Sequence, residues 1–237
     1  MKNKHFKINL TINVIIASIL IVVALISLNS SYVIPVSGNV AIYHGNTDRA
    51  EVSLMFNVYW GTEYVEPILR VLEKYSVRTT FFIGGTWASK NTDTLKLIAT
   101  SGHEIGNHGY FHKDAEKLTY SQNKDEITLT NKLIKEVLSV DVTLFAPPSG
   151  SIGSEMFKAC DDLNMTVIMW SRDTIDWRDK DSSLVLKRAT QDIQNGDFVL
   201  MHPTEHTLKA LPVILDTLQS KGLCVKTVSE CLALEQV

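Results

Sequence analysis

The sequence predicts an α/β fold in which seven short parallel strands, each followed by a helix, form a closed or nearly closed barrel. From residue 52 onward, short β-rich runs alternate with amphipathic helical patterns. The runs are too short and too apolar to face water, which is typical of parallel strands covered by helices. No glycine-rich nucleotide fingerprint follows the first run, so a dinucleotide-binding sheet is disfavoured.

The N-terminus reads as a membrane-targeting segment. Lys2, Lys4 and Lys7 lie in a short basic stretch, residues 1–9, and residues 10–28 follow without any charge. A helix of about 19 residues spans ~28 Å, close to the ~30 Å of a bilayer's hydrocarbon core. We therefore expect a single-pass anchor with a cytoplasmic N-terminus and the domain outside the cell membrane. Cleavage after this segment would instead secrete the domain, although no small-x-small site is evident.

Residues 29–50 are expected to form a linker, and residues 51–237 one domain of ordinary size. All 26 acidic residues but only part of the 23 basic ones follow the anchor, so the domain is mildly acidic and nucleic acid is excluded as a partner. Three cysteines are too few for a disulfide framework. Cys224 and Cys231 are open to two interpretations, a bridge or two core thiols.

The expected elements follow in chain order. Strands are predicted at 52–57, 78–83, 104–107, 143–146, 166–170, 197–201 and 224–228. Helices are predicted at 63–75, 93–101, 120–138, 154–163, 182–194 and 207–221. In a parallel barrel, functional groups gather where strands end and helices have not begun. Polar or conformationally special residues occupy five such positions: Asn57, His108, Pro147-Pro148, Asp173 with Asp176, and His202.

The segment from His103 to His112 holds three imidazoles together with turn-permitting Gly106, Asn107 and Gly109. His108 and His112 are four residues apart, a spacing that lets two ring nitrogens face one divalent ion. A chance pair of histidines on a solvated turn is the alternative.

Together these residues resemble the polysaccharide deacetylases with a NodB homology domain, also called carbohydrate esterase family 4. The resemblance is carried by the segments His108-Gly-Tyr-Phe-His112, Pro147-Pro-Ser-Gly150, Asp173-Thr-Ile-Asp-Trp177 and Leu200-Met-His202, supported by residues 79–83 and 102–108. It extends over roughly residues 50 to 232. It implies a distorted seven-stranded α/β barrel that hydrolyses N-acetyl groups on amino-sugar polymers such as peptidoglycan or chitin-like glycans.

The resemblance also implies roles for the matched positions. His108 and His112 would bind zinc together with an Asp, and the metal would acidify a bound water. A second Asp would take the proton from that water, and His202 would protonate the departing amine. Asp176 would orient His202. Trp177, Tyr59, Trp60 and Pro148 would line the glycan site.

The first motif departs from this pattern. Where active members carry Thr-Phe-Asp-Asp-Gly, this chain reads Met55-Phe56-Asn57-Val58-Tyr59. Asn57 replaces the base, and its amide cannot accept a proton near neutral pH. Val58 replaces a metal ligand, so zinc should be bound weakly or not at all. The Arg of the third motif is also absent around Ala146. The base and this Arg are expected to be lost together. An Arg left beside Asn57 would be an unpaired buried charge, which costs about 3 to 5 kcal/mol.

Three hypotheses follow. The chain is a pseudo-deacetylase that binds a cell-wall glycan, an active deacetylase in which Glu63, Glu205 or Asp173 replaces a lost group, or a purely structural envelope protein. The sequence Asn57-Val-Tyr-Trp-Gly61 resembles a sporulation-linked branch of the family, which favours an envelope role in a Gram-positive cell.

Overall fold

The structure is a computed structural model that describes residues 40–233. The basic segment 1–9, the expected anchor 10–28, the first half of the expected linker (residues 29–39) and residues 234–237 lie outside the described residues. Among residues 40–233, no helix is both long and apolar enough to cross a bilayer.

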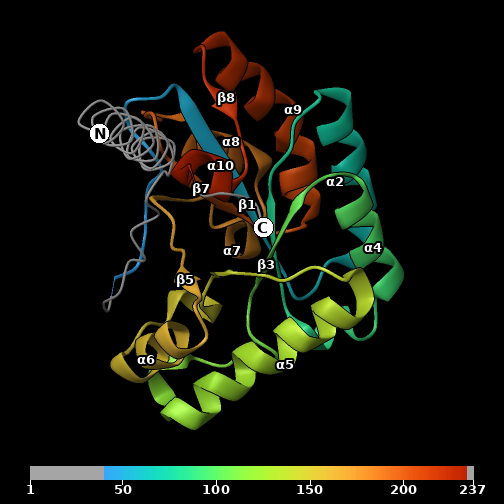
Figure 1. Cartoon of the computed structure of the whole chain (residues 1–237). Coiled ribbons are helices and arrows are strands. Elements are labelled where there is room, and N and C mark those ends of the chain that lie inside the picture. Colours follow the sequence, from blue (N-terminus) through green and yellow to red (C-terminus); the bar gives the residue numbers. More distant parts are fainter. Residues whose placement is uncertain (1–39, 234–237) are drawn as a thin grey trace, which may run out of the picture. The chain divides into compact units, whose positions relative to one another are not determined.

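Eight parallel strands form the centre of the domain (Figure 1). They are β1 (Glu51–Val58), β2 (Thr80–Ile83), β3 (Glu104–Asn107), β4 (Leu144–Phe145), β5 (Thr166–Val167), β6 (Arg172–Asp173), β7 (Phe198–Met201) and β8 (Cys224–Val225). Seven lie in the order β5-β4-β3-β2-β1-β7-β6, and β8 pairs with Glu51 and Val52 at the start of β1. The sheet therefore has the expected parallel α/β architecture.

The barrel is only partly closed, which corrects the expectation of a closed or nearly closed one. In the described part of the chain no strand ladder joins the outer strands β5 and β6. Residues 42 to 45 run between the two instead: Ile42 bridges Ile168, just after β5, in parallel, and His44 bridges Asp197, just before β7, in antiparallel. Part of the expected linker thus contacts the barrel. Strand β6 was not predicted.

The helices follow the strands. They are α2 (Thr62–Lys74), α3 (Gly85–Ala88), α4 (Thr92–Thr100), α5 (Tyr120–Leu138), α6 (Ser154–Asp162), α7 (Asp176–Asp179), α8 (Ser182–Thr190), α9 (Glu205–Ser220) and α10 (Val228–Leu232), with 3-10 turns η1 (Ala115–Lys117) and η2 (Pro148–Gly150). All six predicted helices are present. The short α3, α7 and α10 were not predicted.

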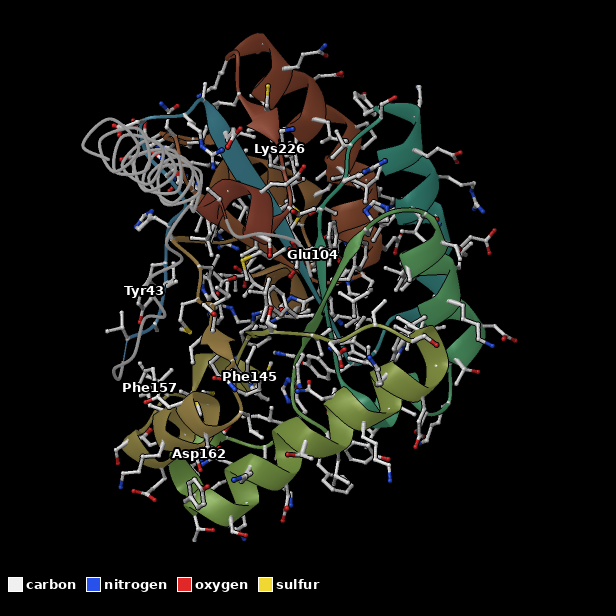
Figure 2. All side chains as sticks on the ribbon, in the orientation of Figure 1. Tyr43, Glu104, Phe145, Phe157, Asp162 and Lys226 are labelled. Atoms are coloured by element: carbon white, nitrogen blue, oxygen red, sulfur yellow. The ribbon has the colours of Figure 1, made fainter. Side chains whose placement is uncertain are left out.

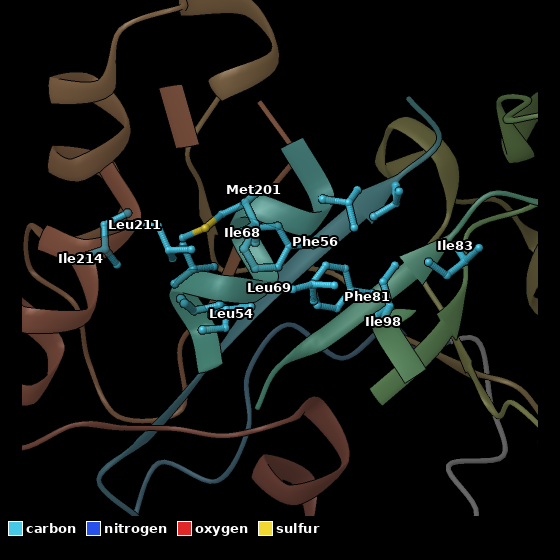
Figure 3. Close-up of a cluster of buried hydrophobic side chains, with 14 of the residues drawn as sticks. Leu54, Phe56, Ile68, Leu69, Phe81, Ile83, Ile98, Met201, Leu211 and Ile214 are labelled. Carbon is cyan, nitrogen blue, oxygen red and sulfur yellow. The ribbon is translucent and has the colours of Figure 1, made fainter. Parts of the chain in front are cut away.

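The main hydrophobic cluster lies between the sheet and the helices α2, α4, α8 and α9. Alternate residues of β1, including Leu54 and Phe56, point into it. They meet Ile68 of α2, Ile98 of α4 and Leu211 of α9 (Figure 3). Each such side chain contributes about 1.5 to 3 kcal/mol by leaving water, so this cluster fixes the helices on the sheet.

Two smaller clusters complete the core. One packs α6 against β4 and β5 and includes Phe145 and Phe157 (Figure 2). The other contains Met55 of β1, Phe82 of β2 and Phe198 of β7, which lie on the inner face of the sheet. Because side chains alternate along a strand, Asn57 shares the inner face with Met55. The three cysteines are all free, so Cys224 and Cys231 do not form a bridge.

Candidate functional site

The loop that follows β3 carries two of the predicted site residues, and α5 holds it in place. The Asn107 side chain accepts a hydrogen bond from Gly109 N at 2.7 Å and donates to the Ile127 carbonyl and to Asn131 Oδ1. Phe111 N donates to the Glu126 carboxylate at 2.7 Å. Backbone groups that would otherwise lie unpaired next to the core are thereby satisfied.

Two residues of this loop have left-handed backbones. Gly109 has a φ of 72°, and a Cβ there would lie 3.2 Å from both Glu126 Oε2 and Pro148 Cγ, so the position favours glycine. His112 has a φ of 55°, an uncommon conformation for a non-glycine residue. Such conformations cluster at functional sites, where the surrounding structure imposes them.

The rings of His108 and His112 lie close together, with centroids 5.0 Å apart and planes at 69°. Two imidazoles that bind one zinc ion through nitrogens about 2.1 Å from the metal have centroids roughly 5 Å apart. His108 Nδ1 donates to the Ala146 carbonyl at 2.7 Å, which leaves the lone pair on Nε2. This pair therefore keeps the geometry of two metal-binding histidines.

Burial lowers the pKa of both imidazoles. His108 is fully buried, and desolvation, followed by the neighbouring His112, lowers its pKa to about 3. Desolvation also lowers the pKa of His112. His108 Nε2 has no hydrogen-bond partner among the described residues.

The end of β1 supplies no carboxylate. Asn57 is 2% exposed, and its Oδ1 is buried without a partner in the described part of the chain. Val58 is fully buried and belongs to the main hydrophobic cluster, where a carboxylate would be strongly disfavoured.

The residues present do not fit a catalytic zinc site. Such a site has three protein ligands, whereas here only the rings of His108 and His112 lie close together, with centroids 5.0 Å apart. Across residues 40–233, no group of three or more His, Cys, Asp or Glu side chains is arranged to hold a metal ion.

Tyr59 packs among the imidazoles. Its ring stacks on His112 with a centroid separation of 3.6 Å and an interplanar angle of 26°. The same ring lies 5.7 Å from the ring of His108 and 6.2 Å from that of His202. Tyr59 thus brings the histidines of two separate loops into one cluster and fills space between them.

Trp60 and Gly61 bring the β1 loop against the β7 loop. The Trp60 ring lies 5.9 Å from the His202 ring with planes only 10° apart. Gly61 has a φ of 74°, and a Cβ there would lie 2.2 Å from the Pro203 carbonyl oxygen. Only glycine permits this approach, which explains why it follows Trp60.

His202 follows β7 and is held by Asp176. The Asp176 carboxylate accepts from His202 N at 2.7 Å and from His202 Nδ1 at 2.8 Å. Thr207 Oγ1 donates to the same carboxylate. Asp176 is 1% exposed, so these hydrogen bonds replace its lost hydration. A carboxylate on Nδ1 fixes the tautomer and leaves Nε2 for a ligand.

The other predicted residues are placed as follows. Asp173 lies in β6, and burial, the largest cause, raises its pKa. Pro148 is buried beside Gly109, and Trp177 is 50% exposed on α7. Glu205 pairs with Lys209 at 2.5 Å, and Glu63 is exposed in the first turn of α2. Neither glutamate joins a cluster that could hold a metal.

Sequence reasoning missed three residues that build the site: Thr207, Glu126 and Asn131. Thr207 lies one helical turn beyond the N-cap of α9 and is buried. In the sequence, the one signal for its role is a threonine on the apolar face of a helix. Glu126 is 6% exposed in the middle of α5, and a buried acidic residue in a helix is a comparable signal.

Comparisons with known proteins agree with this geometry. The polysaccharide deacetylase family model matches residues 44–168. A peptidoglycan-N-acetylglucosamine deacetylase of Bacillus cereus is 30% identical over 71% of this chain and 82% of that protein. The uncharacterized protein YlxY of Bacillus subtilis is 39% identical over 81% of this chain, which spans 60% of that relative's length.

Solved structures show the same fold. The crystal structure of BA3943, a pseudoenzyme of carbohydrate esterase family 4 from Bacillus anthracis, matches with a TM-score of 0.81 and 38% identity, over 84% of this chain and 71% of that one. A mutant of BA3943 with restored enzymatic activity has a TM-score of 0.81 at 36% identity, covering 84% of this chain and 74% of that one. The chain therefore belongs to the polysaccharide deacetylase family, carbohydrate esterase family 4.

Proposed function

We propose that this protein is a deacetylase-fold protein of the cell envelope that binds an amino-sugar polymer without hydrolysing it. The observation that carries the proposal is the end of β1. Asn57 offers an amide where the family's reaction needs a base, and Val58 is packed in the hydrophobic core where a metal ligand is needed. An amide cannot take a proton from water near neutral pH.

Two further observations support a retained glycan site. Trp177 is half exposed next to Asp176, as expected for an aromatic side chain that stacks on a sugar face. Asp176 bonds Nδ1 of His202 and leaves Nε2 available to a ligand, and the ring of Tyr59 brings His202, His108 and His112 into one cluster. The relatives named as peptidoglycan-N-acetylglucosamine deacetylases suggest peptidoglycan as the polymer.

The membrane anchor at residues 10–28 is part of the same proposal. It would tether the domain to the outer face of the cell membrane, within reach of cell-wall glycan, and cleavage would release it. We also propose a sporulation-linked role, which is supported by the sequence Asn57-Val-Tyr-Trp-Gly61.

A second candidate function is a weakly active deacetylase. It is favoured by one observation, the His108 Nε2 lone pair that remains available beside His112. This function would require an external ligand or substrate group to complete a metal site, because the described residues supply no third ligand.

The test combines two measurements on the full-length protein. Release of free amine from peptidoglycan and from N-acetylated chito-oligomers reports hydrolysis, with His202→Ala as the control. Co-sedimentation with the same insoluble peptidoglycan reports binding. Binding without amine release is the expected result. Amine release that His202→Ala abolishes would establish the active alternative, and absence of both would leave a structural protein.

A further inference from the structure

The two buried polar atoms left without partners at the site have the same chemical character. They are Oδ1 of Asn57, 2% exposed, and Nε2 of His108, fully buried. The first is a carbonyl oxygen. The second carries a lone pair because Nδ1 uses its proton on the Ala146 carbonyl. Both are acceptors, so the group that satisfies them must be a donor.

The substitutions in the first motif explain why the site has unpaired acceptors. A metal ion held by a carboxylate at this position would have offered the acetyl carbonyl of a substrate a positive partner. With Val58 in the position of the metal ligand, this partner is missing, and the two unpaired buried atoms that remain among residues 40–233, Asn57 Oδ1 and His108 Nε2, are both acceptors. A buried polar group without a partner is strongly disfavoured, so these acceptors favour a group that carries several donors over an acetamide, which carries one donor and one acceptor.

The charges around the site favour a cation. Asp176 is 1% exposed, and its one ion-pair partner among residues 40–233 is His202. The nearby arginines Arg178 and Arg188 both pair with Asp179 instead. The site thus holds a buried carboxylate that no lysine or arginine of the described chain neutralises.

The limited space in the site and its aromatic rings also favour an ammonium group. Tyr59 fills the region between His112 and His108, where a bulkier acetylated group would need room. Rings such as Tyr59 and Trp60 attract an ammonium group through cation–π contact. An ammonium group carries three donors and no acceptor, which complements the two free acceptors.

We propose that the site recognises the free amino group of a de-N-acetylated amino sugar, so that this protein binds glucosamine-containing glycan rather than its N-acetylated form. The inference rests on the proposed glycan-binding function and deepens it. The protein would then bind the de-N-acetylated glycan that active deacetylases produce in the same cell wall.

The test compares two tetrasaccharides with the full-length protein in detergent. The probes are chitotetraose, built of glucosamine, and tetra-N-acetylchitotetraose, measured by isothermal titration calorimetry with EDTA at near-physiological salt. We expect chitotetraose to bind at least tenfold more tightly. Equal affinities, or preference for the acetylated probe, would overturn this inference while leaving glycan binding intact. Binding of neither probe, nor of peptidoglycan, would instead reject the proposed function.

Variants distinguish recognition at Asn57 from general electrostatic attraction of a polycationic glycan. Asn57→Leu removes one acceptor at similar volume and should bring the affinity ratio close to one. Asn57→Asp adds a charge at the same place and should raise the ratio further, which keeps the inference testable even if Asn57→Leu folds poorly. Glu63→Gln removes an exposed carboxylate of α2 and should leave the ratio unchanged. A ratio that follows Glu63 rather than Asn57 would show simple attraction of a polycation and contradict the inference.

Discussion

The carboxylate of Asp176 bonds both the backbone N–H and the Nδ1 of His202, at 2.7 Å and 2.8 Å. This double contact joins the start of α7 to the end of β7 across the inner edge of the sheet. Because Asp176 is 1% exposed, these two hydrogen bonds contribute to the stability of the folded state.

Asp176→Ala should therefore destabilise the protein strongly. The change leaves the buried donors of His202 and Thr207 without an acceptor, which costs about 2 to 4 kcal/mol in the free energy of unfolding. Thr207→Val removes only one of these donors and should cost about 1 kcal/mol. Urea unfolding of the three proteins measures both values. Equal and small effects would mean that Asp176 is not the anchor of this loop.

Trp177→Ala should weaken glycan binding while leaving stability nearly unchanged. The indole is 50% exposed, so little packing is lost, whereas a stacking contact with a sugar contributes about 0.5 to 1.5 kcal/mol. Affinity for chitotetraose should fall roughly three- to tenfold. Tyr43→Ala, which removes another exposed aromatic side chain at 40% exposure, is the matched control. A similar loss in both variants would argue against a specific role for Trp177.

His103 should make stability depend on pH. Its ring is 7% exposed, Thr79 N donates to its Nδ1, and burial with the nearby Arg78 lowers its pKa to about 4. Above pH 6.5 the ring is neutral in both states. Between pH 6.5 and about 4, the unfolded chain takes up a proton that the folded protein does not. Stability contributed by neutral His103 is therefore lost as the pH falls through this window.

His103→Gln tests this linkage. The amide can still accept from Thr79 N but does not titrate. The free energy of unfolding should fall less steeply between pH 6.5 and 4.5, by up to about 1.4 kcal/mol per pH unit. Chemical unfolding at a series of pH values gives the slope of the free energy of unfolding against pH. A slope that is unchanged in His103→Gln would show that His103 does not cause the pH dependence.

The sequence was sufficient for most of the strands of the sheet and for the residues that follow the ends of these strands. Strands β1 and β3 were predicted almost to the residue, because their apolar runs end at turn-forming or polar residues. Strand β6 was missed because Arg172 and Asp173 carry no apolar signal, and their strand exists only through pairing with Val199 and Leu200 of β7. The incomplete closure of the barrel likewise depends on long-range pairing.

Within the site, sequence order predicted which residues follow strand ends but not how they pack. Tyr59 was expected to line a sugar site, which stays a prediction, and the stacking of its ring on His112 was not foreseen. That contact depends on the course of the chain after Val58 and on the left-handed backbone of His112, which no residue pattern encodes. Val58 was expected beside the histidines as a lost ligand, and its side chain is packed in the core.

The most direct test of the account is the response to zinc. Zinc content and thermal unfolding with and without added zinc should be measured for the unchanged protein and for Asn57→Asp/Val58→Asp/Ala146→Arg. Val58 and Ala146 are fully buried in apolar clusters, so the triple variant should be less stable without metal. Added zinc should raise its unfolding temperature, because an ion that binds only the folded state stabilises it.

The unchanged protein should hold well under one zinc per chain, and its unfolding temperature should not respond to zinc. One tightly bound zinc per chain that is lost in His108→Ala would contradict the central claim, because it would show that the site still completes a metal centre.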